Sequence, residues 1–124
     1  MKQLKIETTV GIYPYAELDE SRRLLYQAAQ EAAQKAYAPY SHFQVGAALL
    51  LDNQALITGS NQENASYPAG CCAERTALFY VGANFPANRV ECIGIVAFNP
   101  NGQVEQISPC GICRQALLET EQRQ

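Results

Sequence analysis

Four of the five cysteines of this chain fall into two short segments, and this placement constrains the fold more than any other feature of the sequence. A disulfide framework normally has an even number of cysteines distributed over a small secreted domain. An odd number in two clusters is more typical of metal binding, which requires the two segments to meet in space. The segments are Cys71-Cys72-Ala73-Glu74 and Pro109-Cys110-Gly111-Ile112-Cys113.

The spacing predicts that three of these thiols converge on one ion. Cys110 and Cys113 are three positions apart, so on a helix both side chains lie on one face. Pro109 favours the first position of that helix, and Cys72 opens a second predicted helix in the same way. Helix N-termini carry unsatisfied N–H groups that stabilise thiolates. We therefore expect two helix starts to direct the Cys72, Cys110 and Cys113 sulfurs at a single metal ion.

Three cysteine ligands are one fewer than a structural zinc site normally takes, which indicates a catalytic site with one open position. Glu74 lies two residues after Cys72, so its side chain must reach around the predicted helix to that position. Three thiolates leave a zinc ion with a net negative charge, which makes it a poorer acid toward bound water. Arg75 is the candidate that offsets this charge, by donating hydrogen bonds to the ligand sulfurs.

Other kinds of site contain a Cys-x-x-Cys pair. A zinc ribbon needs a second such pair, and the chain has none. A thioredoxin-like redox motif follows a strand near the start of a domain, whereas Cys110 and Cys113 lie near the end of this chain. A zinc-stabilised domain without activity is a further alternative, against which Glu74 and the open position argue. A thiol-redox protein would lack stoichiometric zinc.

The bulk composition is that of one compact domain spanning residues 1–124. Apolar residues make up 48% of the chain and charged residues 17%, which is typical of a globular protein. The net charge is −3 and the largest basic cluster is the pair Arg22-Arg23, which argues against a nucleic-acid polymer as partner. The longest apolar run, 45–51, is too short to cross a bilayer. The first residues lack a signal-peptide core, so we expect a cytoplasmic protein.

Hydrophobic periodicity predicts alternating helices and strands in a layered α/β domain. The run 43–51 shows little alternation, so it should be covered on both faces, and Gly46 within it indicates a close approach to the backbone. The run 90–98 is the clearest buried strand. The predicted elements are an extended arm over 1–16, helices over 19–36, 72–81 and 110–121, and strands over 43–51, 55–58 and 90–98.

Four segments of the chain, in this order, resemble the homotetrameric, three-cysteine cytidine deaminases. The resemblance extends from about residue 20 to about residue 120. Family members commonly continue past the last helix with further strands and a tail, which this sequence lacks. The segments are Tyr40-Ser41-His42-Phe43-Gln44-Val45-Gly46-Ala47-Ala48-Leu49, Gly59-Ser60-Asn61-Gln62-Glu63-Asn64-Ala65-Ser66-Tyr67, Cys72-Ala73-Glu74-Arg75-Thr76-Ala77 and Ser108-Pro109-Cys110-Gly111-Ile112-Cys113-Arg114-Gln115.

The resemblance implies a three-layer α/β/α sandwich with a mixed central sheet. It implies hydrolytic deamination of cytidine and 2′-deoxycytidine to uridine and 2′-deoxyuridine, with release of ammonia, in pyrimidine salvage. One zinc ion per chain, held by Cys72, Cys110 and Cys113, would activate a hydroxide that attacks C4 of the base. Glu74 would take the proton of the water, pass it to N3 of the ring and later protonate the leaving amine.

The resemblance also implies contacts with the substrate. Counterparts of Asn61 and Glu63 hold the ribose hydroxyls, the counterpart of Phe43 packs against the base, and the backbone of Ala73 meets the pyrimidine carbonyl. Tyr67 matches a tyrosine that reaches a neighbouring subunit's site, so a homotetramer with sites at subunit interfaces is implied. From the residues alone, Asn61 and Glu63 are better explained as a loop that satisfies its own backbone.

The remaining candidates have simpler interpretations. His42 is the only histidine and reads as a surface residue, Cys92 as a core residue, and Cys71 as a neighbour of the site without a metal role. A deaminase of a modified pyrimidine nucleoside such as blasticidin S is the alternative enzyme. Asn61 and Glu63 favour an ordinary ribose over that alternative.

Overall fold

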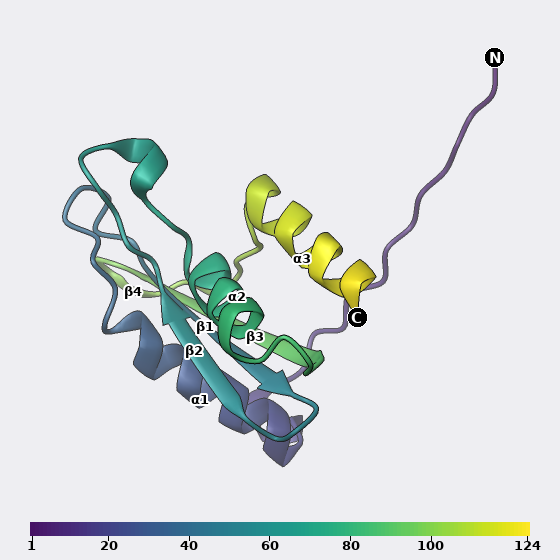
Figure 1. Ribbon diagram of the computed structural model, residues 1–124, viewed down its shortest axis with the longest axis horizontal. Coiled ribbons are helices and arrows are strands. Elements are labelled where there is room, and N and C mark those ends of the chain that lie inside the picture. Colours follow the sequence, from purple (N-terminus) through teal and green to yellow (C-terminus); the bar gives the residue numbers. More distant parts are fainter.

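The structure, a computed structural model, describes residues 1–124 and forms three layers (Figure 1). Helix α1 (Glu20–Ala33) covers one face of a four-stranded sheet, and α2 (Ala73–Asn84) and α3 (Gly111–Arg123) lie on the other face. No helix has the length and apolar composition needed to cross a membrane. The strands are β1 (Gln44–Leu51), β2 (Leu56–Ser60), β3 (Val90–Asn99) and β4 (Gly102–Gln103), with short 3-10 turns η1 (Tyr15–Glu17) and η2 (Tyr67–Ala69).

The α/β class and the three layers agree with the prediction, but the sheet is not mixed. The strand order is β2-β1-β3-β4, and all three pairings are antiparallel. Strands β2 and β3 both run against β1, and α2 connects them by passing over β1. They therefore run in the same direction without being neighbours, and a parallel ladder needs adjacent strands.

Strand β1 is buried on both faces, as its lack of alternation predicts. Successive side chains of a strand point to opposite faces, and the core accordingly divides into two clusters around β1. On the α1 side Ala48 packs in one cluster with Leu25, Ala29 and Val96. On the α2 side the buried residues are Val45, Ala47, Leu49, Leu51, Ala73, Ala77, Leu78, Val81 and Ala97.

Helix α1 lies very close to the sheet because its buried residues are mostly alanines. A Cβ at Gly46 would lie 1.9 Å from the carbonyl oxygen of Ala29 and 2.4 Å from the backbone nitrogen of Ala33. This confirms the close approach predicted at Gly46. The helix ends at Ala33, earlier than predicted. The amides of Lys35 and Ala36 donate hydrogen bonds to the carbonyls three residues earlier, which is the pattern of a 3-10 turn and not of an α-helix.

Strand β3 is less buried than its apolar sequence predicts. Within it only Val96 and Ala97 are buried, whereas most of β1 is. The physical reason is that β4 pairs only with Phe98 and Asn99, so residues 90–97 have a strand on one side only. The prediction of a strand over 90–98 is therefore confirmed, but the prediction that it is the clearest buried strand is wrong, since β1 is more buried.

The N-terminal arm stands apart from the three layers. Residues 1–14 form no helix or strand, and their side chains are exposed. In Figure 1 the arm extends away from the sheet and the helices. The 3-10 turn at Tyr15–Glu17 then leads into α1, whose N-cap Asp19 accepts a 2.8 Å hydrogen bond from the Arg22 amide.

We expect Gly46→Ala to destabilise the fold, because the new methyl would overlap backbone atoms of α1 that cannot move independently. Such overpacking costs about 3 kcal/mol. Urea denaturation would measure the change in the free energy of unfolding. Gly82→Ala is the matched control: no atom lies within 4 Å of a Cβ at this exposed position of α2. The control should gain up to about 1 kcal/mol, and equal midpoints for the two variants would contradict the prediction.

Candidate metal centre

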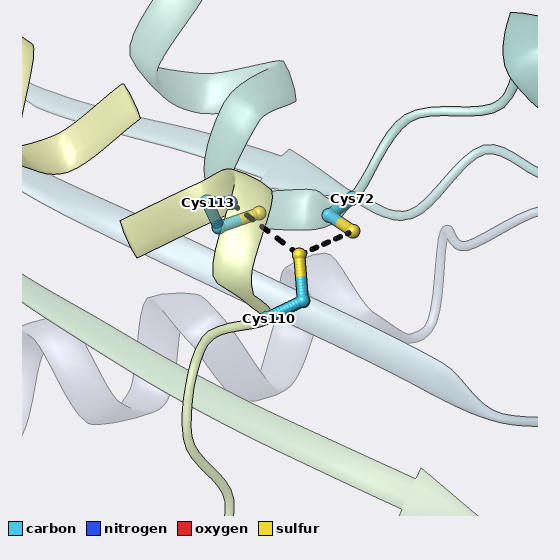
Figure 2. Close-up of side chains that lie close together, drawn as sticks. All are labelled: Cys72, Cys110 and Cys113. Carbon is cyan, nitrogen blue, oxygen red and sulfur yellow. Dashed lines mark hydrogen bonds between the residues drawn. The ribbon is translucent and has the colours of Figure 1, made fainter. Parts of the chain in front are cut away.

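Three cysteines from two helix starts meet at one point (Figure 2). The sulfurs of Cys72, Cys110 and Cys113 all lie within 4.8 Å of one another, and those of Cys72 and Cys110 are 3.8 Å apart. Cys72 is the N-cap of α2 and Cys110 is the N-cap of α3, with Cys113 in the first turn of α3. The structure therefore brings together the two segments that the sequence separates by more than thirty residues.

The sulfur positions fit a tetrahedral zinc site. Zinc–sulfur bonds of about 2.3 Å in a tetrahedron place the ligand sulfurs about 3.8 Å apart. A disulfide would need about 2.05 Å between the sulfurs, and all five cysteines are free thiols. Exposure decreases from Cys110, which is exposed, through Cys72 to Cys113, which is buried. The cluster thus has one side open to solvent and one side closed by the core.

The start of α3 differs from the prediction by one position. Cys110 has extended backbone angles, φ −65° and ψ 168°, so the helix begins at Gly111, and Pro109 lies before the cap. The reason is that the Cys110 sulfur itself caps the helix by accepting a 3.4 Å hydrogen bond from the Cys113 amide. This bond lowers the pKa of the Cys110 thiol. The predicted stabilisation of a thiolate by a helix N-terminus is therefore present.

Burial has the opposite effect on the third thiol. Loss of solvent raises the pKa of Cys113 to about 12. Metal ligation requires a thiolate, so this sulfur needs a strong positive charge beside it to ionise. A divalent cation among the three sulfurs would supply that charge.

Arg75 lies against the cluster. Its guanidinium Nη2 donates a 3.4 Å hydrogen bond to the sulfur of Cys72. Hydrogen bonds to the Cys72 and Cys113 sulfurs raise the pKa of Arg75. Its Nε is buried without a hydrogen-bond partner, while the residue as a whole is half-buried.

Glu74 is buried beside the same cluster, with only 4% of its surface exposed. One carboxylate oxygen, Oε2, lies 3.9 Å from the Cys113 sulfur. The expectation that Glu74 must reach around its helix was wrong, because Cys72 is outside the helix. As an extended N-cap, φ −70° and ψ 155°, Cys72 does not follow the helical rule that residues two apart diverge.

The close packing of α2 on the sheet sets the distance of Cys72 and Glu74 from β2. A Cβ at Gly59 of β2 would lie 2.6 Å from the Ala77 nitrogen and 2.8 Å from the Ala73 oxygen. The absence of a side chain there lets the first turn of α2 rest directly on β2.

Two residues not singled out from the sequence help to hold the ligand-bearing backbone. The Thr76 hydroxyl donates a 3.0 Å hydrogen bond to the carbonyl of Cys72. The Nε of Arg114 donates a 3.0 Å bond to the carbonyl of Pro109, and its Nη2 lies 3.3 Å from the Ser108 hydroxyl. The sequence offered only one indication of this role, which is that both residues follow closely after predicted ligands. Polar residues near the start of a helix are too common for that position to identify them.

The predicted sugar contacts, Asn61 and Glu63, are engaged with backbone. Asn61 accepts a 2.7 Å bond from the Val45 amide and donates a 2.8 Å bond to the Phe43 carbonyl. Glu63 accepts 3.0 and 3.2 Å bonds from the amides of Tyr40 and Ser41. Both residues therefore tie the loop after β2 to the segment before β1, and Asn61 also ties it to the start of β1.

The other predicted residues lie in three different environments. Phe43 is half-buried and packs on the α2-side core, which contains Ala73, the fully buried first residue of α2. Tyr67 is 91% exposed in η2. His42 is exposed with φ 55°, so a surface position is confirmed. Cys92, predicted in the core, and Cys71 are both half-buried and outside the sulfur cluster.

Comparison with known proteins shows that the chain is similar to cytidine deaminases. The family model described as "Cytidine and deoxycytidylate deaminase zinc-binding region" matches residues 19–124. A cytidine deaminase of Halalkalibacterium halodurans is 43% identical over 98 residues, which are 79% of this chain and 70% of the relative. One from Mycobacterium tuberculosis is 42% identical over 94 residues, 73% of this chain and 65% of the relative.

Solved structures agree with the sequence relatives. The cytidine deaminase of Burkholderia pseudomallei has a TM-score of 0.67 and 43% identity, covering 77% of this chain and 73% of that one. The enzyme of Mycobacterium leprae has a TM-score of 0.70 and 39% identity, covering 82% of each chain. This chain thus spans about two thirds of the length of its curated relatives.

We expect Cys72→Ala to abolish stoichiometric zinc binding, because two cysteines and a neighbouring carboxylate do not reproduce the three-thiolate site. Metal analysis of the purified variant would give the zinc-to-chain ratio. Thermal unfolding should also shift to lower temperature, since metal binding and folding are linked. Cys92→Ala is the control, because Cys92 lies outside the cluster. A full zinc complement in Cys72→Ala would exclude Cys72 as a ligand.

Proposed function

Because this chain belongs to the cytidine and deoxycytidylate deaminase family, whose matched region binds zinc, we propose that it deaminates cytidine and 2′-deoxycytidine hydrolytically. The products are uridine or 2′-deoxyuridine and ammonia, a reaction of pyrimidine salvage. The observation that carries the proposal is a three-thiol cluster with a buried carboxylate beside it. Such a donor set leaves a metal ion one position for water and supplies a group that can move its proton.

Zinc held by Cys72, Cys110 and Cys113 would supply a water molecule with a lowered pKa as the nucleophile. Glu74 accepts a proton from this water as it attacks C4 of the base. The same carboxyl then donates that proton to N3. It afterwards takes the proton of the hydroxyl added at C4 and transfers it to the departing amine.

Arg75 and the two helix starts stabilise the thiolates in this scheme. Three negative sulfurs would reduce the acidity of the water, and each hydrogen bond to a sulfur withdraws part of that charge. The bonds from the Arg75 guanidinium to Cys72 and from the Cys113 amide to Cys110 are both present. They counter the charge without adding a ligand, so the fourth position stays available.

The sugar contacts combine a structural and a binding role. An amide nitrogen has two hydrogens and an amide oxygen two acceptor sites, so Asn61 retains capacity after its bonds to Phe43 and Val45. Glu63 lies in the same loop as Asn61, and the amides of Tyr40 and Ser41, which precede β1, hold its carboxylate. We assign these two side chains to the ribose hydroxyls, Phe43 to the face of the base and the Ala73 backbone to the pyrimidine carbonyl.

Tyr67 supports a site shared between subunits. A tyrosine that is 91% exposed has no partner in its own chain, and the resemblance places its counterpart at a neighbouring subunit's site. We therefore propose a homotetramer with sites at subunit interfaces. The cytidine deaminases among the relatives favour an unmodified nucleoside over a substrate such as blasticidin S.

Glu74→Gln should lower the turnover of cytidine by about 100-fold or more, because the amide keeps the shape of the side chain but cannot accept the proton. The fall in cytidine absorbance measures turnover, and metal analysis should show that zinc is retained. Glu31→Gln, an exposed change on α1, controls for the loss of one negative charge. Unchanged activity in Glu74→Gln would remove the proposed proton carrier.

Arg75→Ala should lower activity by about 10- to 100-fold, as loss of a partner to metal ligands usually does. The pH at which activity reaches half its maximum should rise, because uncompensated thiolates make the water less acidic. Activity measured across pH, with unfolding followed in parallel, separates this effect from a loss of stability. Lys35→Ala removes an exposed positive charge as a control. An unshifted pH profile would exclude the charge-offsetting role.

A further inference from the structure

The loop that precedes β1 contains a strained residue. His42 has φ 55°, in the left-handed region, and Gln54 between β1 and β2 is the only other non-glycine residue with a positive φ. Such a conformation costs free energy and persists only where the surrounding contacts impose it. Strained residues are concentrated at binding and catalytic sites, so the contacts on either side of His42 indicate what the loop holds in place.

The side chain of Ser41 bends the chain around His42. Its hydroxyl oxygen accepts a 3.1 Å hydrogen bond from the Phe43 amide, two residues further on, which is the pattern of a serine turn. The His42 amide donates a 3.1 Å bond to the Ala38 carbonyl and closes the turn from the other side. A serine hydroxyl has one hydrogen to donate. Because the oxygen already accepts from Phe43, that hydrogen is directed toward a different partner.

The carboxylate of Glu63 is that partner. Its Oε1 accepts bonds of 3.0 and 3.2 Å from the amides of Tyr40 and Ser41. The pKa of Glu63 lies below its usual value, chiefly because the Ser41 side chain hydrogen-bonds to the carboxylate. The two amides and the charge of His42 act in the same direction, and partial loss of solvent opposes them. The Ser41 hydroxyl therefore links the backbone of Phe43 to an ionised carboxylate.

Hydrogen bonds alone hold this carboxylate in place. Neither ion pair of the chain involves Glu63, so no lysine or arginine fixes it. Ser41 supplies two of its three donors, the amide and the hydroxyl. A carboxylate has about four acceptor sites, so the half-buried Glu63 can still accept a bond from a hydroxyl of a ligand. The direction in which that free site points depends mainly on Ser41.

We propose that Ser41 is a positioning residue, which holds the Glu63 carboxylate in the orientation that accepts the ribose hydroxyls. The proposal rests on the proposed function, which assigns Glu63 to the ribose, and adds a residue that acts through Glu63. The hydroxyl of Ser41 thereby ties the ribose contact to the backbone of Phe43, the residue assigned to the base. Ser41 then contributes to selection of a nucleoside with an intact sugar.

Deamination of cytidine and of 2′,3′-dideoxycytidine, which lacks the 2′- and 3′-hydroxyls, tests the proposal in the zinc-loaded protein. Ser41→Ala should lower kcat/KM for cytidine about tenfold, the usual effect of losing a hydrogen bond to a charged group, and that for the dideoxynucleoside by no more than about twofold. Ser41→Thr keeps the hydroxyl and should restore most of the loss. Ser21→Ala, an exposed change on α1, is the matched control and should alter neither value.

An NMR titration of the Glu63 carboxyl carbon, in the protein without substrate, gives a second measurement. Ser41→Ala should raise the pKa of Glu63 toward its usual value, because the ionised form loses its hydroxyl donor. Ser41→Thr and Ser21→Ala should leave the pKa of Glu63 where it is in the unaltered chain. Glu63→Gln identifies the signal, which disappears in that variant.

Equal losses of kcat/KM for the two nucleosides in Ser41→Ala would overturn the proposal, because they would show a turn that only supports the loop. An unchanged pKa of Glu63 in that variant would also overturn it, whichever substrate the protein takes. If the unaltered chain deaminated neither nucleoside, the proposed function would fall, and the ribose role of Ser41 with it. That result is distinct from equal losses, which leave the deaminase activity in place.

Discussion

The convergence of two helix N-termini on three sulfurs is the constraint on which the rest of this structure depends. Three thiolates would repel one another, so ligand sulfurs within 4.8 Å of one another need opposite charge around them. The sheet brings the two helix starts to the same place, with α2 resting directly on β2 at Gly59. Gly46 performs the same function for α1 on the other face, so both glycines serve the positioning of the layers rather than turns.

A bound metal ion would also help to hold α3 against the body of the protein. Cys113 is the only buried residue of this helix, and Ile112 and Leu118 remain 65% and 47% exposed. Hydrophobic burial alone therefore holds α3 weakly. Ligation of one ion by Cys72 at the start of α2 and by Cys110 and Cys113 at the start of α3 would join the two helices directly, so zinc binding would contribute to folding as well as to chemistry.

The loop contacts show how residues proposed to bind the substrate can also be structural. Asn61 and Glu63 satisfy backbone groups at the start of β1 and in the segment before it, as the residues alone indicated, and we propose that they also bind the substrate. The two roles are compatible because a side chain fixed by backbone bonds loses little entropy when a ligand arrives. The rigid loop then presents its remaining hydrogen-bonding capacity in one orientation.

The sequence by itself determined the helices, the strands and the identity of the clustered cysteines, since hydrophobic periodicity and ligand spacing are local properties of a chain. It predicted β1 as a strand covered on both faces and Gly46 as a point of close approach, and both are correct. It could not determine which strands are neighbours. The structure therefore differs from the expectation in two ways: the sheet is antiparallel and not mixed, and β3 is only half-buried. The extended backbone of the N-cap residues Cys72 and Cys110 was likewise decided by the tertiary structure. Their extended backbone places the sulfurs and Glu74 on one side, and periodicity cannot detect this, because it describes residues inside a helix and not the residue that precedes it.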